Sequence, residues 1–327
     1  MGNQVFGKGA LSLDPVAVSR QIEQTLKEQI FQYLKKKGAV VALSGGIDSS
    51  VTAALCVRAL GKERVFGVML PERDSSGDSL RLAHLLAGTF GIETVVEDIA
   101  PLLEAAGCYR RRDEAIRKQI PEYTENYKSK IAITNPLVHA GMTFFNLVVE
   151  SPEGKQTKVR LDLKPYLEIV AATNMKQRTR KFFEYYYADR YNYAVLGTPN
   201  RLEYDQGFFV KNGDGAADVK PIAHLYKSQV YELAEYLGVP EEICKRPPTT
   251  DTYSLAQTQE EFYFSLPYDQ MDLCLYGKNH NIPSSLVAQE LGLTAEQVDR
   301  VYLDIERKRA SSRYLHAPPL LVEKVIS

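Results

Sequence analysis

Cysteine is scarce in this sequence: there are four among 327 residues, and no two of them form a C-x-x-C pair. Without such pairs the sequence holds no zinc ribbon, no redox dithiol and no framework of disulfides. Widely separated thiols are typical of a reducing compartment, so we expect a cytoplasmic protein. The four residues are Cys56, Cys108, Cys244 and Cys274.

Long apolar runs and an excess of charge are absent as well. The most apolar long window, residues 131–149, is interrupted by Asn135, His139 and Asn146, which excludes a membrane span. A net charge of −1 gives no basis for bulk electrostatic binding to nucleic acid or to a membrane surface. We therefore expect a soluble protein whose partners are small molecules, with no nucleic acid and no membrane among them.

What is present is a regular alternation of strand-like and helix-like segments. Such an alternation implies right-handed βαβ crossovers and predicts an α/β fold, with a doubly wound parallel sheet flanked by helices. Strands are expected at 38–43, 64–70, 93–99 and 193–197, and helices at 15–37, 51–61, 75–91, 176–192 and 227–239.

The alternation breaks between about residues 124 and 172. This segment contains two β-like stretches around a Pro-Glu-Gly turn at 152–154, which predicts a β-hairpin. We interpret it as an insertion within a single domain that spans residues 1–327. Its role is open: it could cover the site as a lid, extend a dimer interface, reshape the pocket, or decorate the surface.

The stretch VVALSGGIDSS, residues 40–50, predicts an anion-binding turn. A buried strand that enters a glycine-rich turn and then a helix directs backbone N–H groups and the positive end of the helix toward one point. Gly45 and Gly46 let the backbone approach a phosphate, and serine hydroxyls add donors. Asp48 would repel a phosphate unless a cation such as Mg²⁺ lay between them. The simpler alternative is that Asp48 and Ser49 only cap the helix.

The SGGxDSS loop resembles the pyrophosphate loop of the N-type ATP pyrophosphatases, which adenylate a substrate and release pyrophosphate. Further matches select the NAD synthetases within that group. They are MLPERDSS (69–76), NMKQRTR (174–180), the long segment at 197–240 with GFFVKNGDGAAD, RPPTTD (246–251) and ERKRASSRYLHAPP (306–319). The resemblance covers almost the whole chain apart from the insertion. It implies a Rossmann-like ATP pyrophosphatase fold.

Carried over residue by residue, the resemblance implies a set of site residues. Magnesium would be held by Asp48 and Glu203, and catalytic roles would fall to Asp48, Lys227, Asp214 and Asp218. Substrate contacts would come from Lys211, Asp214, Asp218 and Lys308. ATP contacts would come from Ser44, Gly45, Gly46, Asp48, Ser49, Ser50, Leu70, Arg178, Thr198, Lys227 and Thr249.

Each of these roles has a plainer structural alternative. Glu203 could be a solvated loop glutamate, Lys227 a surface lysine, and GDGAAD a turn without a ligand. Lys176 and Arg180 are expected in solvent, because side chains two residues apart on a helix point in different directions from Arg178. The family has histidine where Arg307 stands, so the role of Arg307 is left open.

The resemblance implies a two-step amidation of a carboxylic acid with ATP, Mg²⁺ and ammonia. The acid, most simply deamido-NAD, is adenylated with release of pyrophosphate, and ammonia then displaces AMP to give NAD. Ammonia would be free or delivered by a separate glutaminase, and the family implies a homodimer. Two alternatives stay open: an amide synthase for a different acid, and a degenerate nucleotide-binding protein without activity.

Overall fold

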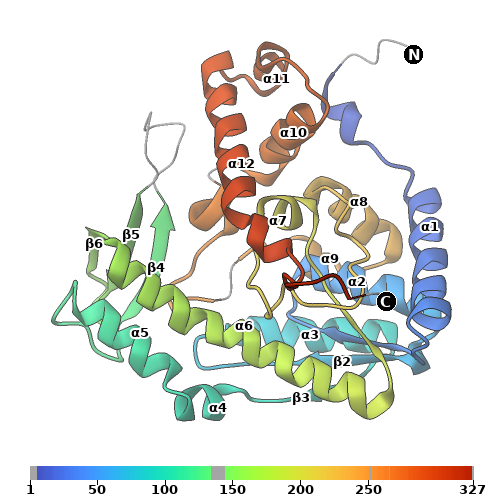
Figure 1. Cartoon of the computed structure of the whole chain (residues 1–327), viewed down its shortest axis with the longest axis horizontal. Coiled ribbons are helices and arrows are strands. Elements are labelled where there is room, and N and C mark those ends of the chain that lie inside the picture. The colour runs from blue at the N-terminus through green and yellow to red at the C-terminus, as the bar shows by residue number, and fades with distance from the viewer. Residues whose placement is uncertain (1–5, 134–143, 250–251, 265, 326–327) are drawn as a thin grey trace.

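The computed structural model describes residues 6–133, 144–249, 252–264 and 266–325. Its centre is a parallel sheet with strand order β3-β2-β1-β7, in which β1 pairs with β2 and with β7 (Figure 1). The strands are β1 (Ala39–Ala42), β2 (Val65–Met69), β3 (Glu93–Val96) and β7 (Ala194–Leu196). The predicted parallel α/β sheet is therefore confirmed.

Alternate residues of β1 pack into cores on opposite faces of the sheet. Val41 belongs to the core formed with α1 (Pro15–Lys27), α2 (Ile47–Leu60), α3 (Gly77–Phe90) and α8 (Lys227–Leu237). Val40 belongs to the core on the other face, with residues of α4 (Ala100–Ala105), α5 (Cys108–Arg117) and α6 (Leu163–Tyr191). A strand exposes successive side chains to opposite faces, so helices must cover both. The sheet is doubly wound, as predicted.

Two helices differ from the prediction at their ends. The helix expected over 15–37 consists of α1 followed by a π-helical segment, Glu28–Tyr33. The helix after the first strand begins at Ile47, so Asp48, Ser49 and Ser50 lie in its first turn rather than in a loop. Gly46 is the N-cap in an extended conformation, and the Ser50 hydroxyl donates to its carbonyl oxygen at 2.8 Å. The Ser50 backbone N–H also donates to the Gly46 carbonyl oxygen, at 3.1 Å, so the helical hydrogen bonds begin four residues earlier than the apolar pattern indicates.

The predicted hairpin forms two strands of a three-stranded antiparallel sheet with order β4-β5-β6. The hairpin strands are β5 (Phe145–Glu150) and β6 (Gln156–Arg160), and the missed strand is β4 (Lys128–Ile133). Met142 and Thr143, which begin the predicted first arm, lie outside the described residues. Helix α6 begins at Leu163, whereas the predicted helix begins at residue 176. The division into one domain with an insertion stays a prediction.

The C-terminal helices form a separate core with Leu202 of α7 (Arg201–Gln206), whereas Ile243 of α9 (Glu241–Cys244) packs into the core around α8. The C-terminal helices are α10 (Tyr268–Asn279), α11 (Ser284–Leu291) and α12 (Ala295–His316), and they stack above the parallel sheet in Figure 1. Val298, Val301 and Ile305 of α12 recur at helical spacing and are buried in this core. In the part of the chain that the structure describes, no helix combines the length and apolar character that crossing a membrane requires.

Candidate active site

A cavity of about 450 Å³ opens at the carboxyl ends of the parallel strands. Its wall includes Ser44 just after β1, Leu70 just after β2, and Thr198 just after β7. Ligand sites of open α/β sheets lie at this edge, because the loops that follow neighbouring strands converge there. The cavity continues to the antiparallel sheet, where the rings of Phe145 and Tyr166 line it and stack at 3.9 Å.

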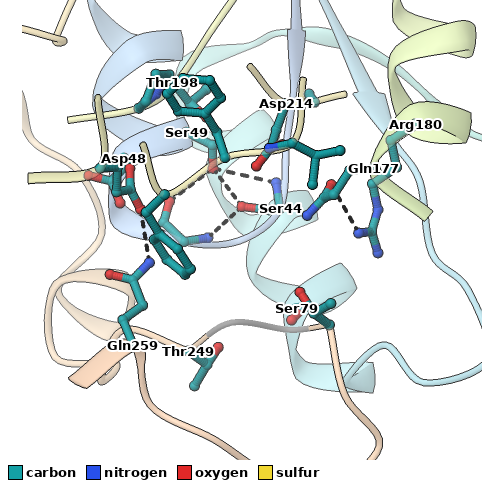
Figure 2. Close-up of a pocket in the computed structure, with 18 of the residues that line it drawn as sticks. Ser44, Asp48, Ser49, Ser79, Gln177, Arg180, Thr198, Asp214, Thr249 and Gln259 are labelled. Carbon is teal, nitrogen blue, oxygen red and sulfur yellow. Dashed lines mark hydrogen bonds between the residues drawn. The ribbon is translucent and has the colours of Figure 1, made fainter. Parts of the chain in front are cut away.

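The turn after β1 is held by hydroxyl groups (Figure 2). The Ser44 and Ser49 hydroxyls lie 3.1 Å apart, and Gly46 N–H donates to the Ser44 hydroxyl at 3.3 Å. Gly45 has φ +73°, and a Cβ there would lie 2.3 Å from the Ser79 carbonyl oxygen. The first glycine of the motif is therefore required both by backbone conformation and by close approach to α3.

Asp48 and Glu203 are brought together by Asn200, although they come from different helices. The Asn200 side-chain amide donates to Asp48 at 3.0 Å, and its backbone N–H donates to Glu203 at 3.1 Å. The second bond belongs to a capping box at the start of α7. Glu203 is thus a helix-capping residue as well as a cavity residue, and the Gln259 amide donates to its other oxygen at 3.0 Å.

Lys227 supplies a buried positive charge to these carboxylates. Its ammonium group donates to Asp48 at 2.5 Å, and its backbone N–H donates to the buried Asp272 carboxylate at 3.1 Å. Burial disfavours the ammonium, but the Asp48 and Glu203 carboxylates outweigh it, and the pKa of Lys227 lies above its usual value. Burial, together with the neighbouring Asp48 charge, raises the pKa of Glu203 to about 8.

Asp214 approaches the cavity from the GDG turn. Val210 N–H donates to its carboxylate at 2.7 Å, and burial raises its pKa. Beside it on the cavity wall, Lys181 donates to Glu184 at 2.6 Å. Burial also raises the pKa of Glu184. This side of the cavity is therefore polar but largely desolvated.

The structure divides the predicted site residues into two groups. Those that line the cavity are Ser44, Gly46, Asp48, Ser49, Leu70, Thr198, Glu203, Asp214, Lys227 and Thr249. Those that do not line it are Gly45, Ser50, Arg178, Lys211, Asp218 and Lys308. The structure establishes only where these residues lie, and their roles in binding and catalysis stay predictions.

The residues outside the cavity are engaged elsewhere. Arg178 donates to the Lys211 carbonyl oxygen at 3.3 Å, and the Lys211 ammonium donates to the Tyr314 carbonyl oxygen at 2.7 Å. The Asp218 carboxylate accepts from Val195 N–H at 2.7 Å, which fixes the turn beside β7. Lys308 pairs with Asp304 at 2.6 Å, and burial lowers its pKa.

The expectation that Lys176 and Arg180 are solvated is wrong. Lys176 is fully buried and donates to Glu72 at 2.9 Å and to Asp74 at 2.7 Å. Arg180 lines the cavity and donates to the Leu70 carbonyl oxygen at 3.3 Å. The error has a physical reason: residues 174–180 lie in the middle of α6 and not at an exposed helix start, and the rest of the chain packs against the sides of the helix that hold Lys176 and Arg180.

One face of α6 lines the cavity with eight residues to which the sequence interpretation gave no site role. Its members recur every three or four residues, which is the spacing of one helical face. They are Tyr166, Val170, Thr173, Asn174, Gln177, Arg180, Lys181 and Glu184. That period is visible in the sequence once the helix is extended back to residue 163. Arg246 and Gln259, by contrast, lie in a long connection whose sequence gives no such signal.

The sequence was compared with protein families and with proteins of known function. The chain matches the NAD synthase family model over residues 18–159 and 148–314. It is 61% identical to an NH(3)-dependent NAD(+) synthetase of Rhizobium meliloti, over 98% of this chain and 96% of that protein. It is 38% identical to an NH(3)-dependent NAD(+) synthetase of Thermotoga maritima, over 76% of this chain and 85% of that protein.

A solved structure of an NH3-dependent NAD synthetase from Campylobacter jejuni has the same fold. It superimposes with a TM-score of 0.61 at 23% identity, covering 95% of this chain and 100% of that one. The resemblance that the motifs predicted is confirmed: the chain belongs to the NAD synthase family.

Proposed function

We propose that this protein is an ammonia-dependent NAD synthetase. The reaction is deamido-NAD + ATP + NH₃ → NAD + AMP + pyrophosphate. The observation that carries the proposal is the meeting of the SGG turn, Asp48, Glu203 and Lys227 in one cavity of a family member. The high-identity relatives bear that name, which favours this reaction over amidation of another acid and over a protein without activity.

In the first step, the turn after β1 binds the triphosphate of ATP. The N-terminus of α2 and the hydroxyls of Ser44 and Ser49 point at one end of the cavity, where they favour an anion. A carboxylate oxygen of deamido-NAD attacks the α-phosphorus, and the bond to the bridging oxygen of pyrophosphate breaks. Negative charge grows on the leaving group, and the Lys227 ammonium stabilises it.

The carboxylates present fit a magnesium ion. Asp48 and Glu203 offer hard oxygen donors from two helices, and Asn200 orients both. No group of three or more acidic, histidine or cysteine side chains suited to a metal occurs in the described ranges, so phosphate oxygens and water would complete the shell. Bound there, Mg²⁺ would neutralise phosphate charge.

In the second step, ammonia attacks the acyl carbon and AMP leaves. A neutral amine reacts only after losing the proton of ammonium, and a buried carboxylate with a raised pKa is a suitable acceptor. Asp214 is partly buried at the cavity wall and has a raised pKa, so it is the acceptor that the cavity offers. The rings of Phe145, Tyr166 and Phe208 exclude water from the same space, which protects the acyl-adenylate from hydrolysis.

Release of AMP from ATP tests the proposal. With Mg²⁺ and ammonium, we expect turnover with deamido-NAD and little with a panel of other acids, including nicotinic acid mononucleotide. Turnover with a smaller acid and none with deamido-NAD would overturn the substrate while leaving the adenylation chemistry intact.

The nitrogen source is tested in the same assay. We expect that ammonium supports turnover and that glutamine alone, in buffer freed of ammonia, does not. The names of the high-identity relatives support this expectation. Formation of NAD with glutamine alone would contradict it.

We also propose that the protein works as a homodimer through α6. Four large apolar side chains on one face of this helix are exposed by 71%, 53%, 62% and 51%: Leu163, Leu167, Phe182 and Tyr186. The helix crosses the front of the molecule in Figure 1. Leu163 and Leu167 lie near the start of the helix and Phe182 and Tyr186 near its end, and exposed apolar side chains of this kind on a surface helix favour burial against a second copy. Arg178, expected to bind substrate, is exposed on the same helix, so a partner there would complete the dinucleotide site.

The double substitution Phe182→Glu, Tyr186→Glu tests this interface. Charges placed in an apolar contact oppose association, so we expect a dimer for the wild type, a monomer for the variant, and a large rise in KM for deamido-NAD. Sedimentation measures the mass. Leu303→Glu on α12 is the control, because Leu303 is an isolated apolar residue, 46% exposed, outside α6. A monomeric, fully active wild type would refute the dimer.

A further inference from the structure

Arg246 reaches the phosphate turn from a segment far away in the chain. It follows α9 and lines the cavity, and its guanidinium donates to the Ser79 hydroxyl at 2.9 Å and to the Gly45 carbonyl oxygen at 3.4 Å. These two contacts place a positive charge beside the first glycine of the SGG turn. Ser79 lies on the opposite side of that turn from Thr198 and Asp214 in Figure 2.

The charges in the cavity wall show why this arginine differs from the lysines. Lys227 is paired with Asp48 at 2.5 Å and Lys181 is paired with Glu184 at 2.6 Å. Both cations are thus largely neutralised. Within the described part of the chain, Arg246 and Arg180 contact neutral oxygens only. Of these two, Arg246 is the one that touches the turn.

A guanidinium at an anion-binding turn, with no carboxylate partner among the described residues, is suited to a phosphate. Its planar fork presents N–H groups in a geometry that binds phosphate oxygens through two parallel hydrogen bonds. The present acceptors, a hydroxyl and a carbonyl oxygen, are weaker partners than a phosphate, and the Gly45 contact is long at 3.4 Å. A polyphosphate bound at the turn would therefore draw the guanidinium away from them.

We propose that Arg246 is a catalytic residue that binds the β- and γ-phosphates of ATP and the pyrophosphate that they become. This inference rests on the proposed function. When the substrate oxygen bonds to the α-phosphorus, the electron pair of the broken bond passes to the bridging oxygen of pyrophosphate. Lys227 and Arg246 stabilise that charge from different segments, and Arg246 remains bound to the leaving group. The connection that begins at Arg246 also includes Gln259, whose amide donates to Glu203. The same segment therefore contacts both the SGG turn, through Arg246, and the proposed metal ligand Glu203.

Binding of inorganic pyrophosphate with Mg²⁺, measured by calorimetry, tests the proposal independently of the acid substrate. We expect Arg246→Gln to weaken pyrophosphate binding at least ~10-fold, and Arg246→Lys to weaken it less, because lysine keeps the charge without the fork. Binding of AMP should stay within about twofold, since AMP carries neither terminal phosphate. Equal pyrophosphate affinity in the wild type and in Arg246→Gln would overturn the proposal.

Exchange between pyrophosphate and ATP, with deamido-NAD and without ammonia, isolates the first step. We expect the rate to fall about 10²-fold in Arg246→Gln. Arg81→Gln is the matched control, because Arg81 lies on α3 near Ser79 but is exposed and paired with Glu242 and Asp78. If Arg81→Gln lost as much exchange as Arg246→Gln, Arg246 would have only a structural role. A wild type without exchange would instead refute the proposed substrate, while the pyrophosphate affinities would still decide the role of Arg246.

Discussion

Replacing Asp48 with asparagine is expected to lower turnover by about 10³-fold while the protein remains folded. The substitution keeps the shape of the side chain but removes the charge that would hold the metal ion. It also spoils an existing contact, since one Asp48 oxygen accepts from Lys227 at 2.5 Å and the other from Asn200 at 3.0 Å. An asparagine has only one acceptor oxygen, so its amide nitrogen must face a second donor. Steady-state assays at several Mg²⁺ concentrations measure the effect.

The control for this experiment is Asp78→Asn in the first turn of α3. Asp78 is half exposed, does not line the cavity, and pairs only with Arg81 among the ion pairs of the described residues. We expect wild-type turnover from it. Circular dichroism and thermal unfolding establish that both variants fold. If Asp48→Asn retained turnover within tenfold of the wild type, the assignment of Asp48 to the metal would fail.

The order of segments along the chain was enough to predict the parallel sheet and the position of the SGG turn. The VVAL strand is apolar on both faces, which is the pattern of a central parallel strand covered by helices on each side. Its end then places Ser44 and Asp48 at the edge where α/β sheets bind ligands. Local sequence decides both features, so no knowledge of tertiary contacts was required.

The environment of α6 could not be predicted in the same way. Lys176 and Arg178 are both basic and only two residues apart, yet Lys176 is fully buried and Arg178 is exposed. Only the tertiary fold supplies Glu72 and Asp74, which come from the loop after β2 and compensate the buried charge. A buried cation without partners would be unfavourable, so the residue type alone predicts that the Lys176 side chain is exposed to solvent. The predicted helix begins at 176 because the insertion was extended to about residue 172, whereas the helix of the structure begins at Leu163.

Asp218 shows a further limit of prediction from motifs. It was expected to be catalytic because it belongs to the GDGAAD segment. In the structure its carboxylate accepts from Val195 N–H and lies outside the cavity, whereas Asp214 of the same segment lines it. A turn brings its residues to different sides, and spacing within a turn does not reveal which side each side chain faces. A contact between Asp218 and substrate would therefore require the neighbouring surface, as in the proposed dimer.

Replacing Lys227 with methionine is expected to reduce both turnover and stability. The ammonium is the cation shared by Asp48 and Glu203, and the Lys227 side chain is only 2% exposed. Its loss leaves two neighbouring carboxylates without that charge, so the free energy of unfolding should fall by about 3 kcal/mol. Turnover should fall about 10³-fold, because the stabilising charge on the leaving pyrophosphate is gone. Urea denaturation and the AMP assay measure the two effects, with Lys245→Met on the exposed pair with Glu241 as control.

The double variant Asp48→Asn, Lys227→Met separates charge pairing from catalysis. If the two side chains stabilise each other, removing both should cost less stability than the sum of the single losses, while turnover should be no lower than in the worse single variant. Additive losses of stability would show that the contact contributes little. Lys227 also occupies an Asp48 oxygen that a metal ion would need. In the absence of ATP, Mg²⁺ should therefore raise the melting temperature of Lys227→Met more than that of the wild type. An equal shift in both proteins would place the metal away from this pair.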